Sequence, residues 1–207
     1  MTLVALSAAY GAGGGRIGPA VAERLGVPFL DRAIPNAVAA ELSVSVDEAV
    51  AFDYETSRSW LERVLSGFIG SDTGAPAPLL SEGATGEDFR HATEEIIRRQ
   101  AESGHGVILG RGAVVVLGGD DRVLRVRLHG PRNRRIRQAM RVRGVDEETA
   151  TDTIRRLDRT HAAYLKHFYG ADIDDPSLYH LMIDSTAIGI DACVDLIVRA
   201  RTALVGD

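Results

Sequence analysis

The stretch "VALSAAYGAGGGRIGPAVAERLG" (residues 4–26) decides the fold that we expect for this chain. An apolar run of strand length covers residues 2–8. Apolar residues then recur at every fourth position, which predicts a helix over about residues 16–25 that ends at Gly26. The segment between the strand and the helix is dominated by four glycines: Gly11, Gly13, Gly14 and Gly15.

A glycine loop between a buried strand and a helix is suited to binding an anion. Backbone N–H groups converge there at the positive end of the helix, and glycine has no side chain to block the approach. Arg16 adds a positive charge at the start of the helix. We therefore expect a phosphate site formed by the four glycines and Arg16, with a simple flexible turn as the alternative.

Two familiar templates for phosphate loops fit this stretch poorly. In the pattern G-x-x-x-x-G-K-[S/T], ending the loop at Gly13 places Gly14 at the lysine and Gly15 at the magnesium-binding hydroxyl. Lys166 is the only lysine in the chain, so a loop lysine is ruled out by inspection. The dinucleotide-binding pattern also has the wrong spacing, and Asp31 lies in "PFLDR" rather than after a clear strand.

Strand and helix patterns alternate along the rest of the chain. Further strands are expected at residues 106–112, 122–128 and 178–186. Helices are expected at about residues 34–42, 45–68, 88–103, 131–143, 146–168 and 189–204. This alternation predicts an α/β fold with a parallel sheet covered by helices on both faces. We expect one domain over residues 1–207, with a mobile surface loop at about 69–88 and a helical lid at about 131–169.

Composition and charge narrow the class of protein. Hydrophobic residues make up 45% of the chain and charged residues 26%, as in ordinary soluble domains, and no apolar run is long enough to span a membrane. The single cysteine, Cys193, fits a reducing cytoplasm and is most simply a buried packing residue. The net charge of −5 argues against nucleic-acid binding. Residues 122–143, however, hold many arginines and no acidic residue, which indicates either a solvated helix face or a site for a small anion.

With the other motifs beside it, the glycine loop resembles that of a known family. The segments "AYGAGGGRIG", "GVPFLDRAI", "TEEIIRRQAESGHGVILGRGAVVVL", "RIRQAMRVRGVDEETATDTIRRLDRTHAAYLKHFYG" and "LMIDSTAIGIDACVDLI" occur in the order found in the cytidylate-kinase-like family. This family is a divergent branch related to bacterial cytidylate kinase, and its members often lack the loop lysine. The resemblance spans nearly the whole chain and is weakest over residues 40–88. It implies a three-layer P-loop nucleoside-monophosphate kinase fold, ATP with Mg²⁺ as donor, and CMP or dCMP as acceptor.

The resemblance also implies which residues bind the acceptor. Asp31 and Arg32 occupy the place of a segment that faces the monophosphate. Arg111 matches the arginine of a "GRD" stretch that reaches the acceptor phosphate, although Gly112 replaces the aspartate. Arg135 falls where the family places the arginine that opens the lid.

In the lid helix the resemblance implies the catalytic residues. Asp158 matches an acidic position beside arginines that grip the phosphates, and Arg156 and Arg159 are available there. His161 stands where another family arginine is expected. His161 and three nearby residues at helical spacing, Tyr164, His167 and Phe168, could also suggest a metal site, but a helix face is the simpler interpretation.

Two classes of function therefore remain. The first is a nucleoside-monophosphate kinase whose arginines cover part of the role of the missing lysine. Its Mg²⁺ would be anchored through a water by Asp31 at best. The second is a catalytically silent protein that binds a nucleotide or another phosphorylated ligand. Either way the expected partners are small ligands, nucleotides in the first instance, and not nucleic acid or membrane. The sequence leaves a homo-oligomer open.

Overall fold

The computed structural model describes residues 2–30 and 86–204. The helices expected at 34–42 and 45–68, most of the loop expected at 69–88, and Asp31 and Arg32 lie outside these residues. The chain divides into two compact units, residues 1–31 with 97–207, and residues 32–96. The sheet and every candidate site residue that the structure describes belong to the first unit.

Strands and helices alternate in the described residues, as the sequence predicts. In chain order the elements are β1 (Thr2–Ala8), α1 (Gly14–Leu25), β2 (Phe29–Leu30), α5 (Gly86–Glu102), β3 (His105–Leu109), α6 (Ala113–Val116), β4 (Val123–His129), α7 (Arg132–Arg143), α8 (Glu147–Tyr169), the 3₁₀ helix η1 (Pro176–Leu178), β5 (Leu181–Asp184) and α9 (Ile190–Leu204). Among the described residues, no helix combines the length and the apolar character needed to cross a membrane.

The five described strands form a parallel sheet in the order β2-β3-β1-β4-β5, which confirms the predicted fold class. The central strand is β1, whose Leu6 is paired with Leu109 on one side and Val126 on the other. After β1 the chain builds β2 and β3 on one side and then β4 and β5 on the other. Ligands of such sheets bind outside the carboxyl ends of the strands where this direction reverses. The glycine loop begins there.

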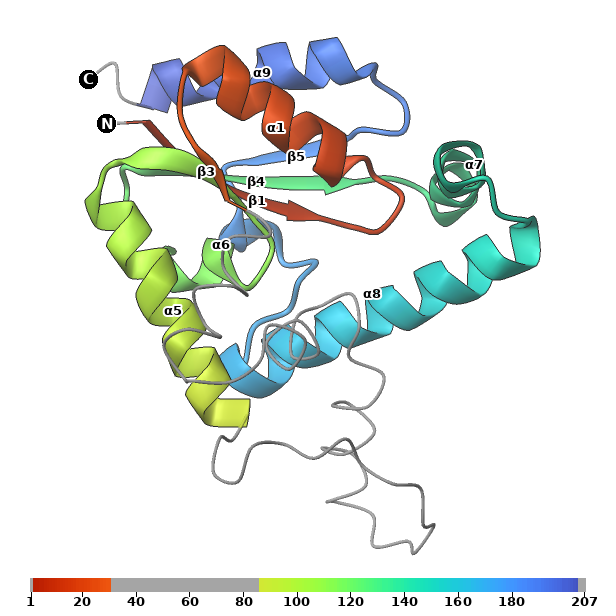
Figure 1. The fold of residues 1–207 in the computed structure, drawn as a ribbon, viewed down its shortest axis with the longest axis horizontal. Coiled ribbons are helices and arrows are strands. Elements are labelled where there is room, and N and C mark those ends of the chain that lie inside the picture. The colour runs from red at the N-terminus through yellow and green to blue at the C-terminus, as the bar shows by residue number, and fades with distance from the viewer. Residues whose placement is uncertain (1, 31–85, 205–207) are drawn as a thin grey trace, which may run out of the picture. The chain divides into compact units, whose positions relative to one another are not determined.

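One face of the sheet packs against α1 and α9, which lie side by side (Figure 1). Even-numbered residues of β1 and β4 point to this face and join a core of wholly apolar character, because side chains alternate along a strand. Its members from the strands are Val4, Leu6, Leu124, Val126 and Leu128, and those from the helices include Ile17, Val21, Cys193, Val194 and Ile197. Cys193 is fully buried there and is a packing residue.

The opposite face of the sheet is more polar. Odd-numbered residues of β1 and β4 point to it, among them the buried Ser7 and Arg127. Helix α8 lies on this side, and α7 stands beyond the carboxyl ends of β1 and β4 (Figure 1). The arginine–apolar alternation of β4 therefore reflects a strand with one apolar and one polar face.

Two strands are shorter than the sequence expectations. The strand expected over 106–112 ends at Leu109, because Gly110, Arg111 and Gly112 all have positive φ and turn the chain into the unexpected helix α6. The strand expected over 178–186 is confined to β5, because a 3₁₀ helix precedes it and a turn at residues 185 and 186 follows it.

Candidate functional site

The glycine loop connects β1 to α1 at the carboxyl edge of the sheet. Gly11 and Gly13 both have φ of 80°, a left-handed conformation that favours glycine. Gly13 is the N-cap of α1, so the helix begins at Gly14, about two residues earlier than the sequence suggests. The loop is anchored from both sides. The Ala9 N–H donates to the Leu128 carbonyl (2.9 Å), and Ser185 Oγ donates to the Ala12 carbonyl (2.6 Å).

The glycines of the loop differ in whether other protein atoms occupy the space where a side chain would lie. A Cβ on Gly11 would lie 2.6 Å from the Arg135 carbonyl oxygen, and one on Gly14 would lie 2.5 Å from the Ala8 Cβ. At these two positions the space is used by the protein itself. A Cβ on Gly15 would meet nothing within 4 Å. The loop is therefore packed at Gly11 and Gly14 and open at Gly15.

The first turn of α1 retains the features of an anion site. The N-terminal turn of a helix leaves N–H groups without intrahelical acceptors. Gly13 supplies no side-chain cap, and no acidic residue lies in the first turn. Gly15 and Arg16 are both exposed. This end of the loop can therefore donate several N–H groups to an anion, with the helix dipole favouring negative charge.

Arg135 is held by the protein on nearly all sides. Its Nη1 and Nη2 donate to the two carboxylate oxygens of Asp158 at 3.0 and 2.8 Å, a bidentate pair. Nη1 also donates to the Tyr10 carbonyl in the glycine loop, and Nε donates to the Gly130 carbonyl, both at 3.0 Å. The Arg135 residue is buried, with only 8% of its surface exposed. We call these contacts of Arg135 with Tyr10, Gly130 and Asp158 the Arg135 clamp.

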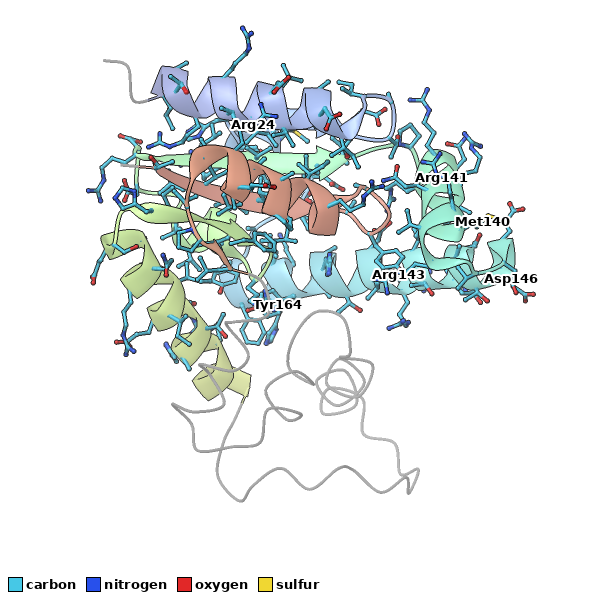
Figure 2. All side chains as sticks on the ribbon, turned by 45° about the horizontal axis from the view of Figure 1, so that its top comes forward. Arg24, Met140, Arg141, Arg143, Asp146 and Tyr164 are labelled. Atoms are coloured by element: carbon cyan, nitrogen blue, oxygen red, sulfur yellow. The ribbon has the colours of Figure 1, made fainter. Side chains whose placement is uncertain are left out.

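Two further residues of α7 contact the glycine loop. The Arg143 guanidinium carbon lies 5.8 Å from the centroid of the Tyr10 ring, within cation–π range. Arg143 is the last residue of α7 and is labelled in Figure 2. Gln138 Nε2 lies 3.0 Å from the position that a Cβ on Gly13 would take. Helix α7 therefore forms one wall of the loop, a role that the sequence pattern did not reveal.

Arg111 lies at the same edge of the sheet as the loop. It directly follows β3, and the Gly110 N–H donates to the Leu6 carbonyl of β1 at 2.8 Å. Its φ is 55°, and it is the only non-glycine residue with positive φ in the described ranges. Such strained positions are concentrated at functional sites. The side chain is buried, and its Nη1 donates to the Leu109 carbonyl at 3.2 Å.

The expected catalytic residues lie on α8 in two different settings. Asp158 belongs to the Arg135 clamp, whereas Arg156 and Arg159 are exposed. The structure thus brings Arg135 and Asp158 to the glycine loop and Arg111 to the same edge of the sheet. The roles of Arg156 and Arg159 stay predictions. The expected acceptor residues Asp31 and Arg32 lie outside the described residues.

A buried polar cluster beneath α8 was not expected from the sequence. Arg127 Nη1 donates to Ser7 Oγ at 2.8 Å, and its Nη2 reaches Asp174 at 3.4 Å. The neighbouring His161 has a buried Nε2. Desolvation and then the Arg127 charge lower the pKa of His161 to about 4, against an opposing effect of Asp158. The alternation of arginine with apolar residues in β4 was the only signal of this cluster.

The described side chains offer no obvious metal centre. Within residues 2–30 and 86–204, no group of three or more His, Cys, Asp or Glu side chains is arranged to hold a metal ion. The rings of Tyr164, His167 and Phe168 on α8 contact one another at tilted or edge-on angles. Tyr164 and His167 have ring centroids 5.0 and 4.7 Å from that of Phe168.

Several solved structures share this fold. An uncharacterized protein from Eubacterium ventriosum ATCC 27560 is 18% identical, with a TM-score of 0.67 over 98% of this chain and 99% of that chain. A gluconokinase from Sinorhizobium meliloti 1021 is 14% identical, with a TM-score of 0.54 over 98% and 93%. A shikimate kinase from Bacteroides thetaiotaomicron is 16% identical, with a TM-score of 0.50 over 100% and 99%. These similarities show a common P-loop kinase fold.

The sequence comparisons identify the family of the chain, which the structural similarities alone do not. No curated protein matches it. The sequence model of the cytidylate kinase-like family, in contrast, matches residues 3–187, which include the glycine loop, the Arg135 clamp and all of the sheet except Thr2. The chain therefore belongs to the cytidylate kinase-like family.

Proposed function

We propose that this protein transfers a phosphoryl group from ATP to a nucleoside monophosphate, CMP or dCMP in the first instance, with a phosphate loop that lacks lysine. The observation that carries the proposal is the open first turn of α1 at the carboxyl end of the central strand. There the exposed Gly15 and Arg16 follow a loop without a side-chain cap. Membership of the cytidylate kinase-like family supports the choice of acceptor.

Phosphoryl transfer requires little covalent chemistry from the protein. It requires two nucleotides held in line, water kept out, and positive charge around the moving phosphoryl group. The N–H groups at the start of α1 would hold the donor phosphates. The exposed guanidinium groups of Arg16, Arg156 and Arg159 are available to neutralise charge without a lysine, by planar bidentate contacts. The expected lid, residues 131–169, would cover the site and keep water out.

Magnesium is not provided for by the described residues. At the position of the usual hydroxyl, Gly15 has no side-chain oxygen, and the Asp158 carboxylate is already paired with Arg135. Asp184 is likewise engaged, by Arg134 at 3.1 Å and by the Thr186 hydroxyl. Mg²⁺ would therefore arrive bound to the phosphates of ATP, with Asp31 as the remaining candidate anchor.

A catalytically silent binding protein is the second candidate. The Arg135 clamp favours it, because an arginine expected at the acceptor phosphate spends its donors on Asp158 and on two backbone carbonyls. Such a protein would keep the loop as a sensor for a nucleotide or another phosphorylated ligand.

A coupled assay for ADP release, run over a panel of nucleoside monophosphates, separates the two candidates. The kinase proposal expects turnover with CMP or dCMP and a fall in kcat of about 30- to 1000-fold in Arg159→Ala, with a smaller change in ATP affinity. Arg159→Lys should restore little, because a point charge does not replace the planar fork. Binding of ATP by calorimetry without ADP formation from any monophosphate would instead establish the silent protein. Unchanged kcat in Arg159→Ala of an active enzyme would remove Arg159 from the mechanism.

A further inference from the structure

Helix α7 is fixed against the glycine loop more firmly than a mobile lid element would be. Arg135 ties it to the Tyr10 carbonyl, and the backbone at Arg135 fills the space left open by Gly11. At the other end of the helix, Arg143 lies over the Tyr10 ring. These contacts come from two turns of one helix, so they fix both the position and the rotation of α7 relative to the loop.

That rotation brings Gln138 to the loop. Residues three apart on a helix share a face, so Gln138 lies on the same side of α7 as Arg135. Its Nε2 is 3.0 Å from the Cβ position of Gly13, the N-cap of α1. The side chain is half-buried, and it makes no hydrogen bond with the residues that the structure describes. An amide with unused donors thus lies beside Gly13, the N-cap residue of α1.

We propose that Gln138 is a phosphate-binding residue, and that its amide takes part of the place of the missing lysine by donating N–H groups to the donor phosphates. The proposal rests on the proposed function of the loop and adds a ligand from a different element. In a loop with lysine the cation comes from the start of the first helix, at the position of Gly14 here. Here the packing of α7 brings a neutral donor to the loop from a different helix.

Isothermal calorimetry with two probes, ATP and inorganic pyrophosphate, tests the proposal on the full chain. Gln138→Leu keeps the size of the side chain and removes both donors, so we expect it to weaken binding of both probes about 10- to 100-fold. Gln138→Glu should weaken binding further by repulsion. Gln138→Lys should strengthen binding several-fold and make it fall more steeply with salt, because a lysine adds the absent charge.

A matched control on the same helix separates a direct contact of Gln138 with the probe from the long-range effect of an added negative charge. Asn133 is exposed on α7, and Asn133→Asp introduces the same carboxylate as Gln138→Glu without reaching the loop. We expect its affinity for both probes to equal that of the wild type. Thermal unfolding of each variant reports whether the fold is intact, and Gln138→Lys and Gln138→Glu decide the question if Gln138→Leu does not fold.

The outcomes distinguish this inference from the proposed function. If the wild type binds both probes and the three Gln138 variants bind them equally well, Gln138 is not a ligand and the proposed function stands. If Asn133→Asp weakens binding as much as Gln138→Glu, the effect is long-range and the proposal is wrong. If the wild type binds neither probe, the loop is not a phosphate site, and both proposals fail.

Discussion

Gly14 and Gly15 are adjacent in the sequence, but only one of them lacks room for a side chain. A methyl group on Gly14 would lie 2.5 Å from the Ala8 Cβ and 3.3 Å from Leu109, whereas one on Gly15 would meet nothing within 4 Å. We expect Gly14→Ala to lower the free energy of unfolding by about 1–3 kcal/mol, because α1 must move away from β1. Gly15→Ala, the matched control, should change it by less than about 1 kcal/mol. Urea denaturation measures both, and equal losses would contradict the packing role of Gly14.

The sequence could predict the glycine loop but not the purpose of each glycine. An apolar strand followed by glycines is a local pattern, so the turn and the helix after it were expected correctly. The tight approach at Gly11 comes from Arg135, which is 124 positions away in the sequence. The same holds for Gln138, for which no local pattern indicated a place at the loop. Such contacts depend on how distant helices and strands pack together, and the local periodicity of a sequence does not show this.

At the scale of elements, α7, α8 and the glycine loop are joined by the Arg135 clamp. Asp158→Asn keeps the shape of the side chain but removes the charge that pairs with Arg135. We expect faster amide hydrogen exchange in residues 10–16, because Tyr10 is held through Arg135, and a loss of about 1–3 kcal/mol in the free energy of unfolding.

A second carboxylate on α8 provides the control for that variant. Asp152 pairs with Arg155 at 2.7 Å, but both side chains are more than half exposed. Exposed pairs contribute little, so Asp152→Asn should leave both the stability and the exchange of residues 10–16 unchanged. If Asp158→Asn is stable but its loop amides exchange as in the wild type, the clamp does not position the loop.

The ends of the elements were predictable wherever a local signal exists. Gly26, Gly144 and Gly170 end α1, α7 and α8 in the left-handed conformation. Asp146 caps α8 by accepting from the Thr149 N–H at 2.7 Å. The end of β3 was missed, because Arg111 adopts a positive φ that its residue type does not suggest.

At the scale of the whole molecule, the alternation of strand and helix patterns was sufficient to predict a parallel sheet covered on both faces. The strand order was not predictable in this way, because it depends on which strands pair. The polar cluster of Ser7, Arg127 and His161 was missed for the same reason, since three elements supply it. This polar cluster also makes the stability of the fold depend on pH.

His161 makes the folded protein less stable in mild acid. Its pKa falls from 6.5 to about 4 in the fold, chiefly by desolvation and then by the positive charge of Arg127. The unfolded chain therefore binds a proton between pH 6.5 and 4 that the folded chain does not bind, and the free energy of unfolding decreases as the pH falls through this window. Between pH 7 and pH 5 this effect amounts to about 2 kcal/mol. His161→Gln cannot be protonated in this range. Between pH 7 and pH 5 its free energy of unfolding, measured by urea denaturation at each pH, should therefore fall by about 2 kcal/mol less than that of the wild type. His161→Asn is a second variant without a titratable side chain, and the same result in both variants would show that the effect does not depend on the glutamine. Parallel pH profiles for the wild type and both variants would show that the imidazole of His161 is not held neutral by its surroundings.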